Sequence, residues 1–442
     1  MFPKEFEERM KELLKNEYEA FESALNEAPV KAFHINTKKI SVEDFLKINP
    51  FDTEKIPYAK NGFYFSDGKI GNHPYHHAGM IYVQEPSAQA PVNCITTEPD
   101  WKVLDMCAAP GGKSSQIACQ IPNGFLFSNE YVSSRCKILS GNIERMGYEN
   151  TAVISCDALT IGKNFTEYFD LIICDAPCSG EGMFRKEENA VSEWSLENVE
   201  KCAIRQLEII ENIKNALKKG GTLVYSTCTY SLEENEELIK TFLENNPDFY
   251  LTETPDEIKN NSSQGIGNME YTRRFYPHIN KGEGQFVAVL KKKKGENTPK
   301  EIKDILLPLT KQEEKIVCEF LDETLTSYDK KKIKKHNDSI IYIDENIKIP
   351  KVPVFLCGVK LGTVQKNYFQ PHHQLFTALG HLFRKKINLS LNEAEKYLHG
   401  ETIPCEFDKG WYAVCIENVA MGGGKAVNKT LKNHYPKGLR TL

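Results

Sequence analysis

The sequence predicts an α/β protein built on a doubly wound parallel sheet, with a smaller module at each end. Two observations predict this class. Over residues 81–293, short apolar runs alternate with amphipathic helices, the pattern of parallel strands joined by helical crossovers. The chain has 442 residues and 40% hydrophobic residues, enough for about two to four domains with ordinary buried cores.

Five apolar runs are expected as the strands of the sheet. In order they are WKVLDMC, GFLFSN, TAVISCDA, FDLIICDAP and GTLVYSTC. Between them, SSRCKILSGNIERMG and ENVEKCAIRQLEIIENIKNALKKG carry apolar residues at helical spacing, and the second runs into Lys-Lys-Gly-Gly, a typical helix stop. FYPH and GQFVAVLKKKK are expected to close the sheet as a hairpin.

The flanking regions are shorter and differ in charge. Residues 1–80 predict a small N-terminal α+β module that opens with an amphipathic helix over 1–25. After the hydrophilic boundary KKKKGENTP, we expect a small helical linker domain over 298–345 and a last module over 346–442, with strands near VPVFLCGVKLGTV and GWYAVCIEN. Residues 351–442 hold 13 Lys and Arg against 6 Asp and Glu. This excess is compatible with nucleic-acid binding and equally with solvated surface charge.

Hydropathy and cysteine use exclude several classes of protein. No stretch approaches the roughly 18 apolar residues of a membrane span, and the charged N-terminus lacks the apolar core of a secretory signal. The 13 cysteines include no CxxC pair, which favours reduced thiols in a cytoplasmic protein over a disulfide scaffold or a zinc ribbon. The histidines of HPYHH have no cysteine near them, and we expect no metal.

A glycine-containing turn, VLDMCAAPGGKSSQIA, joins the first strand of the expected sheet to a helix that starts near Lys113. Such a turn lets backbone amides and a helix N-terminus approach a ligand closely. The second strand ends in Asn129-Glu130 and the third in Cys156-Asp157, so Glu130 could accept both hydroxyls of a ribose and Asp157 could meet an adenine edge. Together they predict a nucleoside cofactor, with a helix-capping role as the alternative for Glu130.

Two cysteines follow the ends of the fourth and fifth strands. Cys178 lies in DAPCSGEGMFRK, three residues after Asp175, and Cys228 lies in STCTYS, just before a new helix whose N-terminus would favour a thiolate. By default such cysteines are small, inert apolar residues. If both strand ends open onto one crevice, however, the two thiols and Asp175 converge beside the cofactor, and Arg185 and Lys186 could hold a thiolate or a phosphate.

A thiolate, a carboxylate and a nucleoside cofactor together suit the methylation of cytosine at C5. This carbon is too weakly nucleophilic to take a methyl group directly, but a thiolate added at C6 makes it enamine-like, and a carboxylic acid near N3 assists. S-adenosylmethionine supplies the methyl group. C5 then loses its proton and the thiolate leaves, a release that a second thiol could assist. Spacing alone does not assign these roles to one cysteine or the other.

Three segments closely resemble the NOP–Sun family of RNA cytosine-5 methyltransferases. DMCAAPGGKSSQIA, CDAPCSGEGMFRK and YSTCTYSLEENE match its cofactor, fourth and sixth motifs in the correct order, and YVQEPSAQAP and RRFYPHINKGEGQFVAVLKK match further segments. The resemblance implies a class I (Rossmann-like) methyltransferase sheet that uses S-adenosylmethionine. It also implies that Cys228 is the nucleophile, that Cys178 serves product release, that Asp175 contacts the base and that Lys113 belongs to the active site.

The same resemblance implies a set of cofactor-binding residues. They are Cys107, Ala108, Ala109, Pro110, Gly111, Gly112, Lys113, Glu130, Arg135, Asp157 and Asp175. The tail, with GVKLGTVQKNYFQPHHQLFTALG and GWYAVCIENVAMGGGKAVNKTLKNHYPKGLR, is similar to the PUA-like RNA-binding domain of the RsmF-type bacterial members, which methylate 16S ribosomal RNA. One departure is His34-Ile35-Asn36, where the family has Arg-Val-Asn, so an arginine that could hold RNA backbone is a histidine here.

These observations predict a cytoplasmic monomer that methylates C5 of cytosine in 16S rRNA or in the small ribosomal subunit, with no membrane partner. The same chemistry on tRNA is the alternative substrate. From another class, the chain could be a non-catalytic RNA-binding factor of ribosome assembly. The presence of both cysteines, Asp175 and Lys113 argues against that class.

Overall fold

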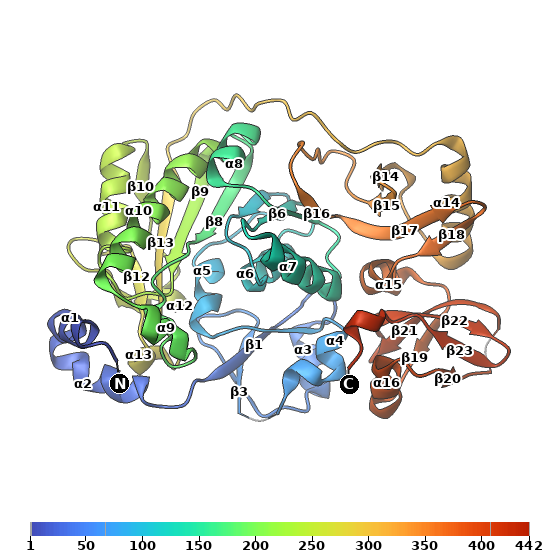
Figure 1. Cartoon of the computed structure of the whole chain (residues 1–442), viewed down its shortest axis with the longest axis horizontal. Helices are drawn as coiled ribbons and strands as arrows, with labels where there is room; N and C mark the ends of the chain where they lie inside the picture. The colour runs from blue at the N-terminus through green and yellow to red at the C-terminus, as the bar shows by residue number, and fades with distance from the viewer. Residues whose placement is uncertain (1, 67, 407, 442) are drawn as a thin grey trace.

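The computed structural model describes residues 2–66, 68–406 and 408–441, and within them a ten-stranded sheet forms the centre of the molecule (Figure 1). Its strand order is β11-β12-β13-β9-β8-β5-β6-β7-β16, with β10 also paired to β13. The strands from β9 to β7 in this order are parallel, and the flanking ones are antiparallel. Because β5 lies between β6 and β8, the sheet is doubly wound, as predicted.

The strands of this sheet include the five predicted apolar runs and the predicted closing hairpin. Their bounds are β5 (Lys102–Asp105), β6 (Phe125–Asn129), β7 (Thr151–Ile154), β8 (Phe169–Asp175), β9 (Leu217–Thr227), β10 (Phe249–Leu251), β11 (Ser263–Gln264), β12 (Arg273–Phe275), β13 (Gln285–Lys292) and β16 (Val354–Cys357). The helices between them are α5 (Ala90–Asn93), α6 (Gly112–Gln120), α7 (Ser133–Met146), α8 (Ala158–Asn164), α9 (Glu188–Glu193), α10 (Leu196–Ile213), α11 (Glu236–Asn245), α12 (Asp256–Lys259) and α13 (Pro277–Asn280).

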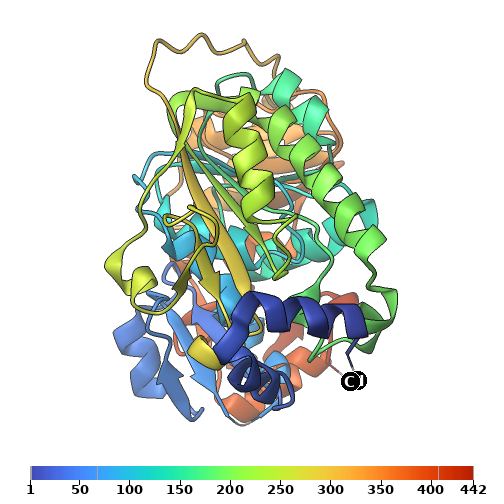
Figure 2. The ribbon, with the colours of Figure 1, turned by 90° about the vertical axis from the view of Figure 1, so that its left-hand side faces the viewer.

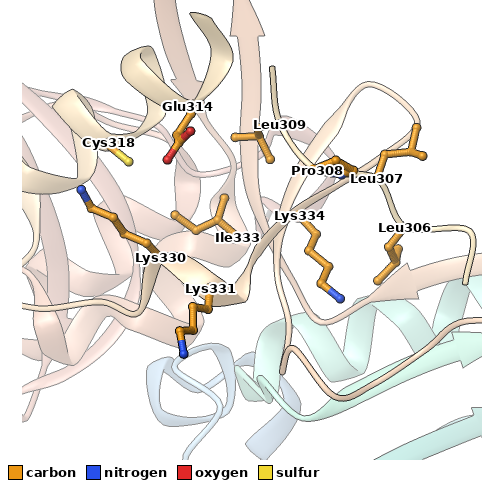
Figure 3. Close-up of a pocket in the computed structure, with 10 residues that line it drawn as sticks. All are labelled: Leu306, Leu307, Pro308, Leu309, Glu314, Cys318, Lys330, Lys331, Ile333 and Lys334. Carbon is orange, nitrogen blue, oxygen red and sulfur yellow. The ribbon is translucent and has the colours of Figure 1, made fainter. Parts of the chain in front are cut away.

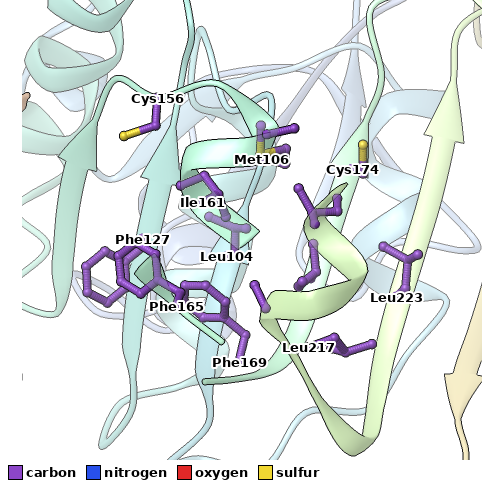
Figure 4. Close-up of a cluster of buried hydrophobic side chains, with 14 of the residues drawn as sticks. Leu104, Met106, Phe127, Cys156, Ile161, Phe165, Phe169, Cys174, Leu217 and Leu223 are labelled. Carbon is purple, nitrogen blue, oxygen red and sulfur yellow. The ribbon is translucent and has the colours of Figure 1, made fainter. Parts of the chain in front are cut away.

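Helices cover both faces of the sheet because its central strands are apolar on both sides. Successive residues of a strand point to opposite faces. Val103 and Leu126 pack with α6 and α7, whereas their neighbours Leu104 and Phe127 pack with α8, α10 and α11. Figure 4 shows the second of these cores, in which Phe127, Phe165 and Phe169 lie close together on one face of the sheet.

Two predicted helices end differently from expectation. The helix expected over 197–220 ends at Ile213, and Lys-Lys-Gly-Gly lies within β9, because pairing with β8 starts at Leu217. Gly220 has a φ of 83° and turns the strand instead of stopping a helix. The first expected helix is broken at Lys15, whose φ is 50°, into α1 (Lys4–Leu14) and α2 (Tyr18–Leu25).

The N-terminal module is a small antiparallel sheet of order β2-β3-β1-β4. Its elements are β1 (Lys31–Ile35), α3 (Val42–Ile48), β2 (Thr53–Lys55), β3 (Gly62–Phe65), α4 (Pro74–His77) and β4 (Ile81–Val83). The two first helices do not join this sheet. Phe6 packs on Phe184 and Phe21 packs on Tyr230, so α1 and α2 cover loops of the central domain, as Figure 2 shows in dark blue.

The segment expected as a small helical linker domain is helical only in its first half. After α14 (Lys311–Thr324), β14 (Ile333–His336) and β15 (Ser339–Tyr342) form a hairpin. β15 also pairs with β17 (Val359–Gln365), and β17 pairs with β18 (Tyr368–Pro371), in the order β14-β15-β17-β18. The helical expectation is wrong for residues 333–342, because they form a hairpin whose second strand, β15, also pairs with β17 later in the chain. A cavity of about 400 Å³ lies between segment 306–309, α14 and β14 (Figure 3).

The last module contains a mixed sheet of order β19-β21-β22-β23-β20. Its elements are α15 (His373–Leu379), β19 (Lys386–Asn388), α16 (Leu391–His399), β20 (Ile403–Pro404), β21 (Gly410–Ile416), β22 (Val419–Val427) and β23 (Thr430–Asn433). The strand expected at VPVFLCGVKLGTV is two strands, and the first of them, β16, leaves the module and pairs with β7 of the central sheet. None of the described helices is long and apolar enough to cross a membrane.

Candidate active site

Two neighbouring parallel strands, β8 and β9, bring both predicted thiols to one edge of the sheet. Asp175, the last residue of β8, is in register with Ser226 near the end of β9. The loops that follow therefore leave the sheet side by side. Cys178 Sγ and Cys228 Sγ lie 3.2 Å apart, and both side chains are half-buried.

Asp175 is held by three donors at the same edge. Lys113 Nζ donates to Oδ2 at 2.7 Å, and Ser226 Oγ and Gln285 Nε2 donate to Oδ1 at 2.7 and 2.8 Å. Burial alone would lower the pKa of Lys113, but the Asp175 carboxylate and, to a smaller extent, Asp105 and Cys228 raise that pKa above its ordinary value. Lys113 is therefore a buried ammonium beside the carboxylate. The sequence did not point to Ser226 or Gln285.

The Cys178 thiol resists ionisation. Its hydrogen bond with Cys228, its burial and the nearby carboxylate of Glu234 raise the pKa of Cys178 well above its ordinary value. Arg185 does not offset this effect, because its guanidinium is bound elsewhere. Its Nε donates to Glu283 Oε2 at 2.5 Å and its side chain is 3% exposed. The expectation that Arg185 holds a thiolate or a phosphate is wrong.

Two buried carboxylates that the sequence analysis did not assign to the site lie behind the thiols. Glu234 accepts hydrogen bonds from Ser179, the residue after Cys178, and Glu181 accepts them from Thr229, the residue after Cys228. Both carboxylates are almost fully buried. The signal available in the sequence was their presence inside the two cysteine motifs, SGEGMFRK and SLEENE.

The glycine turn between β5 and α6 has the predicted form. The helix starts at Gly112, and Gly111 has a φ of 118°, a backbone conformation that favours glycine. Arg135 Nη2, from α7, donates to Ala109 O at 2.9 Å. Residues 107–112 therefore form one turn, which a hydrogen bond from α7 holds in place and which leads directly into the first residue of α6.

Two predicted cofactor acids follow the neighbouring strands. Glu130 is 4% exposed, accepts from Val132 N at 2.9 Å and pairs with Arg135 at 3.4 Å. Asp157 is exposed and caps α8, where it accepts from Thr160 N at 2.7 Å and Thr160 Oγ1 at 3.0 Å. The bond from Thr160 N is the main reason that the pKa of Asp157 lies below its ordinary value. Both carboxylate oxygens of Asp157 thus accept hydrogen bonds from its own helix. Within the described part of the chain, Glu130 accepts only one hydrogen bond, from Val132 N, and so has more capacity left for a ligand.

His34, the first residue of the expected departure from Arg-Val-Asn, faces the interior. Its ring stacks on Tyr82, and Nε2 lies 2.8 Å from Ser115 Oγ of α6. Burial lowers the pKa of His34 to about 3, so the ring is neutral at physiological pH. This position joins the N-terminal module to the central domain, and a contact with RNA backbone through this side chain is ruled out by its 2% exposure.

Comparisons with known proteins agree with this architecture. The model of the N-terminal domain of 16S rRNA methyltransferase RsmF matches residues 2–86, that of 16S rRNA methyltransferase RsmB/F matches 92–291, and that of the methyltransferase RsmF PUA domain matches 384–441. Ribosomal RNA small subunit methyltransferase F of Erwinia tasmaniensis is 32% identical, over 99% of this chain and 96% of that protein. The chain belongs to the RsmF family of 16S rRNA methyltransferases.

A second relative carries the same name, and two solved structures have a similar fold. Ribosomal RNA small subunit methyltransferase F of Vibrio campbellii is 33% identical over 92% of this chain and 91% of its own. A methyltransferase homolog from Pyrococcus horikoshii is 30% identical, with a TM-score of 0.59 over 66% of this chain and 95% of that one. NSun6 from the same organism, solved with SFG, is 25% identical, with a TM-score of 0.60 over 66% and 99%. The expected NOP–Sun resemblance and methyltransferase fold are thereby confirmed.

Proposed function

We propose that this RsmF-family methyltransferase transfers a methyl group from S-adenosylmethionine to C5 of a cytosine in 16S rRNA through a covalent bond between Cys228 and C6. The observation that carries the proposal is the pair of thiols, 3.2 Å apart, beside a carboxylate that is bonded to a buried ammonium. A cysteine that only packed in the core would need neither a second thiol nor a charged pair beside it.

The cofactor edge fits a nucleoside with a charged tail. The turn at 107–112 leads into the N-terminus of α6, and carboxylates stand at the ends of β6 and β8, Glu130 and Asp175. These groups suit ribose hydroxyls and a cationic centre. S-adenosylmethionine bound here supplies an electrophilic methyl group. The fit is supported by the NSun6 structure with SFG, an analogue of that cofactor.

The residues of the chain account for the remaining chemistry. Cys228 Sγ forms a bond with C6, and the electron pair of the C5–C6 double bond makes C5 a nucleophile. Asp175 and Lys113 lie beside the thiols, where they can stabilise the charge that develops on the ring at N3. After methylation, C5 gives up its proton to water, and the electron pair of the C5–H bond restores the C5–C6 double bond. The C6–S bond breaks with its electron pair on Cys228 Sγ, which the Cys178 thiol can protonate. We assign assistance in this release to Cys178.

The C-terminal module is proposed to bind RNA. Its family model is the PUA domain of RsmF, and Lys409, Lys429 and Lys432 are exposed on it. Within the part of the chain that the structure describes, these three lysines form no ion pair, so their charges are free to meet phosphates.

Bisulfite sequencing of total RNA from a strain without the gene tests the proposal. We expect one or more 5-methylcytosines to disappear from 16S rRNA and to return when the wild-type gene, but not a Cys228→Ala gene, is restored. Loss of 5-methylcytosine from tRNA with unchanged 16S rRNA would show that the substrate assignment is wrong. Unchanged cytosines in both RNAs would contradict the C5 chemistry.

A further inference from the structure

The two thiols of the site are chemically identical but stand in different electrostatic surroundings, although the loop after each of them is bonded to a buried carboxylate, Glu234 or Glu181. On the Cys228 side lies the buried ammonium of Lys113, bonded to Asp175 at 2.7 Å. On the Cys178 side lies Glu234, whose side chain is fully buried. The proposed function needs unlike thiols, because one must attack C6 while the other must not.

Glu234 is fixed directly behind Cys178. Ser179 N donates to its Oε2 at 3.0 Å, Ser179 Oγ donates to Oε1 at 2.5 Å, and Gln206 Nε2 donates to Oε2 at 2.7 Å. All three donors are uncharged, so they hold the carboxylate in place without cancelling its charge. Burial raises the pKa of Glu234 to about 6, and a carboxyl group is ionised above its pKa, so the charge is present at neutral pH.

The loop of Cys228 is tied to the loop of Cys178 by the second buried carboxylate. Glu181 accepts from Thr229 Oγ1 and from Tyr230 N, both at 2.8 Å, and Thr229 Oγ1 lies 2.9 Å from Ser179 Oγ. A backbone bond of 2.8 Å from Gly182 N to the carbonyl of Cys228 adds to this link. These bonds set the separation of the loops, and with it the short distance between the sulfur atoms.

We propose that Glu234 is the positioning residue that makes the two thiols unlike, by keeping their shared proton on Cys178 Sγ and leaving Cys228 Sγ as the attacking sulfur. A fixed negative charge beside Cys178 disfavours a second negative charge on that sulfur, whereas the Lys113 ammonium favours one on Cys228. The inference rests on the proposed function for the assignment of the two cysteines. It goes beyond it by naming the group that separates their roles.

Competitive alkylation of the full-length protein, without RNA or cofactor, tests this inference. Limiting iodoacetamide is added at about pH 7.5, where thiolate rather than thiol reacts, and mass spectrometry quantifies the two modified peptides. In the wild type, Cys228 should be modified in preference to Cys178. In Glu234→Gln the ratio of modified Cys228 to modified Cys178 should fall about threefold or more, because each unit of thiol pKa changes the thiolate fraction about tenfold.

Glu233→Gln is the matched control, since it removes the same charge one residue earlier in the chain. Glu233 contacts Arg9 and Ser231, not Ser179. The alkylation ratio should therefore stay at the wild-type value in this variant. An unchanged ratio in Glu234→Gln, or an equal fall in both variants, overturns the inference.

Ser179→Ala decides the question if Glu234→Gln does not fold. The Ser179 hydroxyl lowers the pKa of Glu234, so the alkylation of this variant and of the wild type is compared at about pH 8.5, where the carboxylate stays ionised. The ratio should then stay equal to the wild-type value. A fall would show that the loop, rather than the charge, controls the thiols, and would overturn the inference. Because the readout needs no RNA, its failure is distinct from a failure of the proposed methylation.

Discussion

The two halves of the carboxyl edge of the sheet are held together in different ways. At the thiol half, formed by β8 and β9, Asp175 accepts hydrogen bonds from residues 51, 62 and 110 positions away, and Glu234 and Glu181 are bound by donors from similarly distant segments. At the cofactor half, formed by β5 to β7, Glu130 and Asp157 take backbone donors from two and three residues away.

This difference separates a part of the site that the tertiary fold fixes from a part that local segments build. At the thiol half, the three carboxylates each accept three hydrogen bonds from the protein, so the geometry is set before substrate arrives. At the cofactor half, acceptor capacity is left over: Asp105 Oδ1 has no hydrogen-bond partner among the described residues. Substitutions at the thiol half should disturb several groups together, and those at the cofactor half should act locally.

The largest effects are expected at the thiols themselves. Cys228→Ala should abolish methylation and form no covalent complex with RNA, because no other group can activate C5. Cys178→Ala should still attack C6 and accept the methyl group, and then stall as an adduct that survives SDS and migrates slowly on a gel. Cys318→Ala, a half-buried cysteine on α14, is the control and should behave as wild type. An adduct from Cys228→Ala instead would reverse the two roles.

Asp175→Asn tests the carboxylate that ties the thiol half together. It keeps the size of the side chain and removes its charge, and it leaves the Lys113 ammonium without its partner. Methyl transfer in single-turnover experiments should slow by about 10²- to 10⁴-fold, the range for a positioned acid–base group. Asp170→Asn, at the far end of the same strand and paired with Lys218, should keep wild-type rates. Equal losses in both variants would mean a general destabilisation of β8.

Glu130→Ala should act at the cofactor half alone. Loss of hydrogen bonds to a charged group should weaken S-adenosylmethionine binding by about 1.5–3 kcal/mol, measured by calorimetric titration. Asp157→Ala is the comparison, because both of its oxygens already serve Thr160. It should change affinity less and should lower the free energy of unfolding by about 0.5–2 kcal/mol, as for a lost helix cap. If folded Glu130→Ala bound S-adenosylmethionine with wild-type affinity, Glu130 would have only a helix-capping role.

The smallest effects are expected far from both halves, on the C-terminal module. Replacing Lys409, Lys429 and Lys432 by Ala should reduce the slope of log K for RNA against log salt by about 0.7–0.9 for each phosphate that the module no longer binds. Cofactor affinity should not change. The alkylation ratio of the two thiols is a further control and should also stay constant. A salt slope equal to that of wild type would remove these lysines from the RNA-binding surface.

Much of the architecture could be predicted because it depends on residues that are close together in the sequence. The apolar run around Val103-Leu104 and the glycine turn before Lys113 are short-range signals, and they placed β5 and the turn that leads into α6 correctly. The motif resemblance then brought Cys178 and Cys228 to one site. The sequence pattern could not predict the contacts of residues whose partners lie far away in the sequence.

Three features show this limit in physical terms. Arg185 follows Cys178 closely in sequence, yet its partner is Glu283, almost a hundred residues later, so proximity to the motif was misleading. Glu234 was visible as part of a motif, but its bond to Ser179 depends on the packing of two loops. β15 pairs with β17, which lies beyond the segment 298–345 that was expected to be helical.

The pairing of β16 with β7 has a consequence for the order in which the protein is made. β7 ends at Ile154 and β16 ends at Cys357, about 200 residues later. At a synthesis rate of roughly 5–20 residues per second, the growing chain carries an open edge on β7 for roughly 10–40 s. Such an edge can pair with another chain. The edge of the central sheet at β7 therefore stays unpaired until late in translation. β16 can cover it only after about 357 residues have been made.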